Sequence, residues 1–156
     1  MKKIIALEGK EQLTEEVKQF DQSLQQVVKD LKETVKKTEG VALSAPQIGV
    51  NQRVTVIDFK DEREPLVLVN PTLVKFFETS VEMEGCLSYP NVFGEVKRPR
   101  AIIIEAEDEQ GQVFEITAED FEARVILHEM DHLYGVSFKD KISRFVALDE
   151  FEEDIE

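Results

Sequence analysis

The sequence predicts a single α+β domain in which antiparallel or mixed β-sheets surround a central helix, with a long amphipathic helix near the N-terminus. Three observations support this prediction. Helical periodicity occurs near the start of the chain and again near its end, strand-like runs occupy the middle, and the two kinds of segment do not alternate regularly. A length of 156 residues suits one hydrophobic core, so we expect residues 1–156 to form one domain.

The N-terminal helix is predicted from apolar residues that recur every three or four positions between Leu13 and Val35. We expect this helix over about residues 12–38, with its end near Gly40. A dimeric coiled coil has similar spacing, but the pattern covers fewer than four heptads and continues directly into globular sequence. We therefore interpret the apolar stripe as the face that packs on the core.

Strand-like runs rich in β-branched and aromatic residues follow the first helix. We expect strands at residues 54–58, 66–69, 73–77, 101–106 and 113–116. Residues 109–112 read Glu-Gln-Gly-Gln, in which Gly111 can supply the positive φ of a hairpin turn. The last two strands should therefore pair antiparallel.

Helical periodicity returns at about residue 117 and includes Phe121, His128 and His132. Gly135 is placed to end this second helix. The helix carries the sequence His-Glu-Met-Asp-His at residues 128–132, which makes it the element of greatest chemical interest.

The composition excludes several classes of protein. With 42% hydrophobic and 33% charged residues, the chain resembles an ordered globular protein. A net charge of −14 opposes direct binding to nucleic acid or to an anionic membrane. No run approaches the roughly 20 apolar residues of a membrane span, and the single cysteine, Cys86, cannot form an intramolecular disulfide. We therefore expect a soluble protein of the cytoplasm, with a solvated acidic tail at residues 149–156.

The strongest chemical signal is the pair His128 and His132. Two imidazoles four residues apart on a helix project from the same face and can bind one metal ion, with Glu129 beside them. They are the only histidines in the chain. The alternative is a surface helix with two solvated histidines, but random placement rarely produces this spacing together with the glutamate. We therefore predict a metal site.

A catalytic metal site of this kind has three protein ligands and one open position. One metalloprotease class has a third histidine six residues after the second, where this chain has Phe138, so that class is excluded. Another class uses a later glutamate, for which the acidic tail offers candidates. The third candidate is Cys86, in Glu84-Gly85-Cys86-Leu87-Ser88, because a thiolate is a strong, soft ligand. An isolated cysteine is more often a small buried hydrophobe, yet the histidine pair favours a ligand.

Three motifs resemble the peptide deformylase family. They are Gly-Val-Ala-Leu-Ser-Ala-Pro-Gln-Ile-Gly at residues 40–49, Glu-Gly-Cys-Leu-Ser at 84–88, and His-Glu-Met-Asp-His-Leu-Tyr-Gly at 128–135. They occur in the family's order and spacing, and the resemblance extends from the first helix to about Ser143. It implies hydrolysis of the N-formyl group of N-formylmethionyl nascent polypeptides, with release of formate, and we interpret the chain as a bacterial, cytoplasmic enzyme.

The resemblance implies metal ligation by Cys86, His128 and His132. The usual metal would be Fe(II), which Zn, Ni or Co can replace. Glu129 would act first as general base on metal-bound water and then as general acid toward the departing amine.

Hydroxide attack on the formyl carbon produces an oxyanion. By the same resemblance, the metal, the side-chain amide of Gln47 and the backbone N–H of Leu87 would stabilise it. The substrates would be N-formylmethionyl peptides, and a transient ribosome contact follows from the function rather than from the charge.

The resemblance also implies a methionine pocket built from the first motif and from the helix before the first histidine. The expected substrate contacts are Gly40, Val41, Ala42, Leu43, Phe121, the aliphatic stem of Arg124, and Val125. Phe121 and Val125 could equally be core residues at helical spacing. Asp131 should have a charge partner, such as Arg100, that orients the helix.

The chain departs from the family's usual Gly-x-Gly-Leu-Ala-Ala motif at two positions. Ala42 replaces the second glycine and Ser44 replaces the first alanine. The added atoms could crowd the bound peptide. Two alternatives therefore remain open: a deformylase-like metal-binding or peptide-binding protein of low activity, and a metalloprotease in which a tail glutamate is the third ligand.

Overall fold

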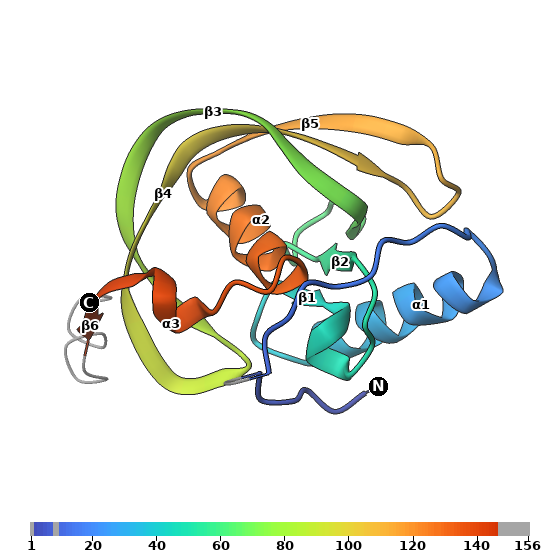
Figure 1. The fold of residues 1–156 in the computed structure, drawn as a ribbon, viewed down its shortest axis with the longest axis horizontal. Coiled ribbons are helices and arrows are strands. Elements are labelled where there is room, and N and C mark those ends of the chain that lie inside the picture. The colour runs from blue at the N-terminus through green and yellow to red at the C-terminus, as the bar shows by residue number, and fades with distance from the viewer. Residues whose placement is uncertain (1, 8–9, 147–156) are drawn as a thin grey trace.

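The computed structural model describes residues 2–7 and 10–146 (Figure 1). The acidic tail at 149–156, and with it the tail glutamates, lies outside the described residues. Along the chain the elements are α1 (Gln22–Lys36), β1 (Ala42–Ser44), the short 3-10 helix η1 (Ala45–Ile48), β2 (Val54–Ile57), β3 (Leu66–Cys86), β4 (Tyr89–Glu107), β5 (Val113–Glu119), α2 (Asp120–Leu133), α3 (Phe138–Lys141) and β6 (Ile142–Val146).

The first helix is shorter than the sequence predicts, because it begins at Gln22 and not near residue 12. Asp21 caps the helix, since its side chain accepts a hydrogen bond from the N–H of Leu24 at 3.1 Å. The preceding residues satisfy their backbone groups elsewhere: Leu13 forms an isolated bridge with Tyr134. Competition from these pairings is what excludes residues 12–20 from the helix.

Six strands form one antiparallel sheet in the order β1-β2-β3-β4-β5, with β6 paired to β4. The expected hairpin between residues 101–106 and 113–116 is confirmed: Ala101 pairs with Glu119 and Glu107 with Val113. Gly111 lies in the connecting turn with φ +85°. The other expected strands are parts of longer ones, because β3 and β4 continue through residues 78–100 as one curved hairpin.

The sheet curls around α2, and β3, β4 and β5 arch over that helix in Figure 1. The short strands β1 and β2 lie between the two main helices. On one side Leu43 packs with Leu31 of α1, and on the other Ala42 packs with Ile126 of α2. Successive residues of a strand face opposite sides, so β1 contributes to both parts of the core. This arrangement places the first sequence motif directly against the histidine-bearing helix.

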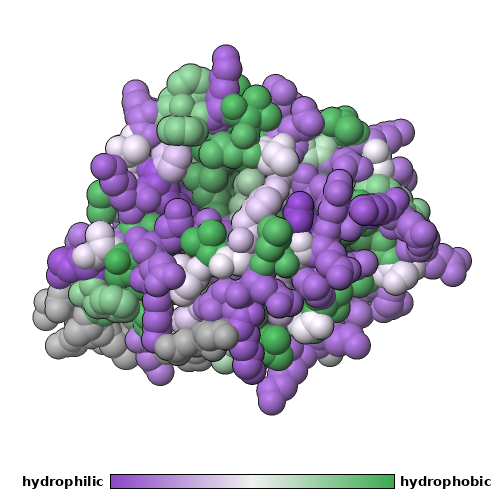
Figure 2. Space-filling view, in the orientation of Figure 1, coloured by the Kyte–Doolittle hydropathy of each residue, from purple (hydrophilic) through white to green (hydrophobic). Residues whose placement is uncertain are grey.

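A cavity of about 440 Å³ lies between α2 and β3. Leu127 and Met130 of α2 line it together with Leu73 and Phe76 of β3. Figure 2 shows hydrophobic residues gathered below the arch on the face seen in Figure 1, within a mostly hydrophilic surface.

In the part of the chain that the structure describes, no helix is both long and apolar enough to cross a membrane.

Candidate metal centre

The helix α2 carries both histidines and the glutamate between them. Its first turn holds Asp120 and Glu122, whose charges suit the positive end of the helix dipole. It ends before Gly135, which has φ +74°, and a side chain there would lie 2.5 Å from the backbone of Gln12. Only glycine fits this position, so the helix end is fixed against the N-terminal segment.

The structure brings Cys86, His128 and His132 together, as the sequence predicts. Their ligand atoms all lie within 4.8 Å of one another, and the Sγ of Cys86 is 3.3 Å from the Nε2 of His132. Ligands of one tetrahedral ion lie about 3.5 Å apart. One thiolate and two imidazoles suit a transition metal better than Mg²⁺ or Ca²⁺. The three side chains therefore fit a single such ion.

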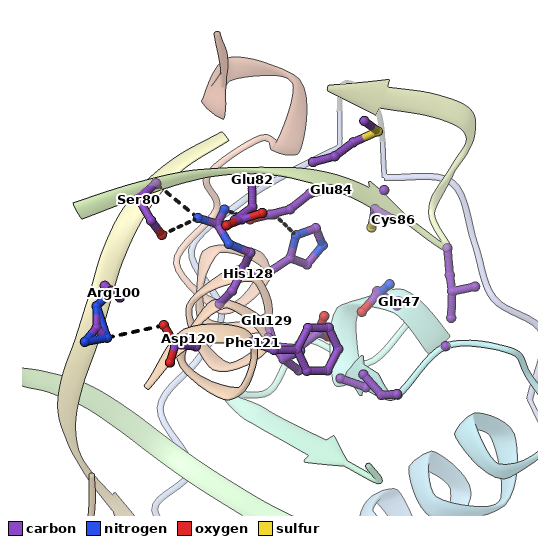
Figure 3. Close-up of a pocket in the computed structure, with 18 residues that line it drawn as sticks. Gln47, Ser80, Glu82, Glu84, Cys86, Arg100, Asp120, Phe121, His128 and Glu129 are labelled. Atoms are coloured by element: carbon purple, nitrogen blue, oxygen red, sulfur yellow. Dashed lines mark hydrogen bonds and ion pairs between the residues drawn. The ribbon is translucent and has the colours of Figure 1, made fainter. Parts of the chain in front are cut away.

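Glu84 holds the first histidine in place. Its Oε1 lies 2.9 Å from the Nδ1 of His128, a contact drawn in Figure 3. Because Nδ1 faces Glu84, the opposite ring nitrogen, Nε2, is the one available on the Cys86 side. Glu84 is two residues before Cys86 on β3, so the two side chains lie on the same face of the strand. That spacing is the sequence signal by which Glu84 could have been found.

Two buried arginines neutralise Glu84. Arg98 donates to both carboxylate oxygens, from Nε at 2.7 Å and from Nη2 at 3.0 Å. Arg124 donates to Oε2 at 2.5 Å and to the backbone oxygen of Val96 at 2.9 Å. A buried carboxylate with these partners stays charged without the cost of an unpaired ion.

The charge partner of Asp131 is Arg98, at 2.8 Å, so the expectation of Arg100 is wrong. Arg100 instead pairs at the surface with Glu78 and Asp120. The physical reason is the path of β4 along α2. Arg98 lies beside Asp131 in the last turns of the helix, whereas Arg100 lies beside Asp120, its first residue. Arg98 therefore links Glu84 of β3 to Asp131 of α2.

Burial and charge shift the pKa values of this cluster in different directions. Burial alone would raise the pKa of Glu84, but hydrogen bonds from His128 and Arg98, with the charge of Arg98, lower it to about 2. Burial raises the pKa of Glu129, although the charge of His128 and a hydrogen bond from Ser44 oppose this. Burial, together with the charges of His128 and Arg98, lowers the pKa of His132 well below its usual value. The ring of His132 is therefore neutral, as a metal ligand must be.

Burial alone would lower the pKa of His128, but hydrogen bonds to Cys86 and Glu84 raise it to about 10. A metal ion would replace the proton on the Cys86 side of the ring and leave the hydrogen bond to Glu84 in place.

A cavity of about 590 Å³ is lined by two of the three ligands, Cys86 and His128, and by Glu129. It is lined by the first motif, the end of β3 and the first turns of α2, and the expected residues Gly40, Val41, Ala42, Phe121, Arg124 and Val125 are among its walls. Leu43 does not line the cavity: its side chain is fully buried in the core beneath α1. Because side chains alternate along β1, Ala42 faces the cavity side and Leu43 the opposite side.

Gln47 and Leu87 also line the cavity, and Figure 3 shows Gln47 near Glu129. The side-chain oxygen of Gln47 accepts a hydrogen bond from the N–H of Ser44 at 2.9 Å, and its nitrogen donates to the Oγ of Ser88 at 3.1 Å. The hydroxyl of Ser44 lies 3.1 Å from the Oε1 of Glu129. Sequence reasoning treated Ser44 only as added bulk and missed this contact, which depends on how closely β1 approaches α2.

Comparison with known proteins gives one consistent family. The family model described as polypeptide deformylase matches residues 3–147. A peptide deformylase of Caldicellulosiruptor bescii is 44% identical over 137 residues, which cover 88% of this chain and 81% of that protein. Peptide deformylase 1 of Bacillus subtilis is 41% identical over 136 residues, which cover 87% of this chain and 85% of that protein.

Solved structures agree. A peptide deformylase from Legionella pneumophila matches with a TM-score of 0.87 and 38% identity, over 92% of this chain and 86% of that chain. A peptide deformylase from Synechococcus elongatus in complex with actinonin matches with a TM-score of 0.85 and 35% identity, over 90% of this chain and 79% of that chain. The fold of the described residues is therefore that of these enzymes, a single domain with an antiparallel sheet and few helices.

Proposed function

Because the chain belongs to the polypeptide deformylase family, we propose that it hydrolyses the formyl group of N-formylmethionyl nascent peptides and releases formate. One observation supports the assignment to particular residues: Cys86, His128 and His132 converge, and Cys86 and His128 line a cavity together with Glu129. Nascent chains are made in the cytoplasm, so we propose that compartment and a transient ribosome contact.

We assign the metal to Cys86, His128 and His132, with Fe(II) as the metal in the cell and Zn, Ni or Co as substitutes. The mixed sulfur and nitrogen donor set supports such an ion. When bound, a divalent metal lowers the pKa of water and polarises a carbonyl oxygen. Three protein ligands would leave one coordination position free for water, as catalytic sites require.

Glu129 is the proposed general base and general acid. Hydrolysis forms a bond between a water oxygen and the formyl carbon and breaks the bond from that carbon to nitrogen. Glu129 takes one proton from the attacking water and delivers it to the departing amine nitrogen. Burial raises the pKa of Glu129, which favours a group that must hold a proton between the two transfers.

The oxyanion that forms on the formyl oxygen is assigned to the amide of Gln47 and the backbone N–H of Leu87. The hydrogen bond from Ser44 to the oxygen of Gln47 supports this, because it turns the –NH₂ group toward Ser88 and the cavity. That amide has two N–H groups, and Ser88 accepts only one of them in the contacts described. Preorganised donors of this kind stabilise the transition state more than the substrate.

The methionine side chain is assigned to the part of the cavity lined by Val41, Phe121 and Val125. The guanidinium of Arg124 is bound to Glu84, to Val96 and to Ser80, so the part of this residue left for the pocket is its aliphatic stem. Gly40 and Ala42 complete the proposed wall next to the peptide.

The test is formate release from formyl-Met-Ala-Ser by protein loaded with Fe(II) without oxygen, with the Ni(II) form assayed in parallel. Turnover by both forms supports the proposal. Metal binding without turnover by either form would contradict it and favour the low-activity alternative. In that case Ala42→Gly should restore turnover, mainly through a lower KM, if the methyl group of Ala42 obstructs the peptide.

A further inference from the structure

Ser44 is fully buried at the end of β1, with its hydroxyl among three acceptors. The Oγ of Ser44 lies 3.1 Å from the Oε1 of Glu129, 3.2 Å from the backbone oxygen of Glu129 and 3.1 Å from the Oγ1 of Thr55. Water has no access to this position, so the hydroxyl depends on these protein groups for its hydrogen bond.

The number of protons decides which acceptor Ser44 uses. The Thr55 hydroxyl donates to the backbone oxygen of Leu43 at 3.0 Å, so toward Ser44 it can only accept. Ser44 has one proton for three acceptors. A hydrogen bond to an ionised carboxylate is about twice as strong as one between neutral groups. The proton of Ser44 is therefore directed to the Oε1 of Glu129 whenever Glu129 is charged.

The same residue also orients the other side chain assigned to the reaction. The backbone N–H of Ser44 donates to the Oε1 of Gln47 at 2.9 Å. Ser44 thus contacts Gln47 through its backbone and Glu129 through its side chain. A shift of β1 would change both contacts, whereas removal of the hydroxyl leaves the backbone N–H of Ser44 to donate to Gln47.

Resting on the proposed function, we propose that Ser44 is a positioning residue of the hydrolysis. Its hydroxyl donates to the Oε1 of Glu129 and holds the carboxylate in one orientation, with Oε2 toward the cavity. Because Oε1 accepts from Ser44 while Glu129 is charged, Oε2 is the oxygen left to take the proton from water. Without the hydroxyl, the carboxylate can rotate and place that proton on either oxygen.

The experiment compares Ser44→Ala with Thr55→Val in the Ni(II)-loaded protein. Ser44→Ala should lower kcat about 3- to 10-fold, the effect of one hydrogen bond. Its KM for formyl-Met-Ala-Ser and its metal content should stay within about twofold of the parent's, since the hydroxyl contacts neither peptide nor metal. Thr55→Val should keep kcat and lower only the melting temperature, because it removes the bond to Leu43 but leaves Ser44 its bond to Glu129. Ser44→Cys, which keeps the volume but donates weakly, should behave as Ser44→Ala.

A readout independent of activity is the orientation of Glu129 in crystal structures of the metal-free parent and of metal-free Ser44→Ala. The proposal expects one orientation in the parent and a rotated or doubled carboxylate in the variant. An unchanged orientation, or an unchanged kcat, would overturn it. Equal losses of kcat in Ser44→Ala and Thr55→Val would also overturn it, because the hydroxyl would then serve only the pairing of β1 with β2. A parent without turnover in any metal form would be a failure of the proposed function, and the orientation of Glu129 would still decide the role of Ser44.

Discussion

Glu84 is not a metal ligand in the proposed site, but it orients the ring of one proposed ligand, His128. It accepts hydrogen bonds from Arg98, Arg124 and His128 while only 6% of its side chain is exposed. The arginines keep it charged, and the charged carboxylate fixes the ring of His128. The donor atom of that histidine is thereby held in place before any ion arrives, which reduces the entropy lost on metal binding.

Replacing Cys86 with alanine should remove tightly bound metal, because one of three ligands and its negative charge are lost. Metal content measured by mass spectrometry after gel filtration checks this. The control is deletion of residues 149–156, which contains the tail glutamates and should keep the metal. A full complement of metal in Cys86→Ala, or its loss on deleting the tail, would reject the assigned ligands and favour the metalloprotease alternative.

Replacing Glu129 with glutamine should keep the metal and lower kcat by about 10² to 10⁴, the usual contribution of general acid–base catalysis. Glutamine has nearly the same shape but cannot take up a proton at neutral pH. Metal content and kcat for formyl-Met-Ala-Ser measured on the same sample separate the two effects. If kcat stays within about tenfold of the parent value, the proton transfers belong to another group.

At the scale of elements, α1 shows where sequence periodicity stops being informative. Leu13 and Leu31 belong to the same predicted apolar stripe, but Leu31 is fully buried in the helix and Leu13 is 60% exposed outside it. Leu31→Ala should therefore lower the free energy of unfolding by about 2–5 kcal/mol. Leu13→Ala should change it by less than about 0.5 kcal/mol. Urea denaturation of both variants checks this, and similar losses would mean that the helix extends toward residue 12.

Arg98 and Arg100 lie two residues apart on β4 but should differ greatly in importance. Arg98, 4% exposed, links β3, β4 and α2 through Glu84 and Asp131, whereas Arg100, 39% exposed, makes surface pairs. Arg98→Leu removes one of the two arginines that pair with buried Glu84, and the only one that pairs with Asp131 in the contacts described, and should cost about 3–5 kcal/mol of unfolding free energy. Arg100→Leu should cost about 0–1 kcal/mol. Equal costs in chemical denaturation would show that the network around Glu84 does not stabilise the fold.

The part of the site that the sequence predicts is the part with local spacing. The histidines are four residues apart on one helix face, and only one cysteine exists to join them. The hairpin with Gly111 is local as well. The pairing of Asp131 with Arg98, the contact of Ser44 with Glu129 and the continuation of β3 and β4 through residues 78–100 depend on how distant elements cross. Residues 78–83 of β3 are all exposed or half-buried, so this stretch lacks the alternation of buried and exposed residues that would predict a strand.

For the whole molecule, the assigned metal would connect parts of the chain that lie far apart in sequence. Cys86 ends β3, the long strand that arches over α2, and the two histidines lie on α2 itself (Figure 1). An ion bound to all three joins the arch to the helix beneath it. Binding to the folded state alone stabilises that state by mass action. The metal is therefore expected to act on the stability of the fold as well as on the reaction.

Removal of the metal should lower the melting temperature of the whole domain in one cooperative transition. With free metal at about 100 times Kd, binding contributes about 2.7 kcal/mol, which corresponds to about 5–11 °C for a chain of this size. Calorimetry of the Ni(II)-loaded protein before and after chelation, followed by reloading, measures this difference. Cys86→Ala should melt at the same temperature with and without added Ni(II), since the ion can no longer join β3 to α2. If the parent's melting temperature is also insensitive to chelation, the three side chains do not hold a metal tightly in the folded protein.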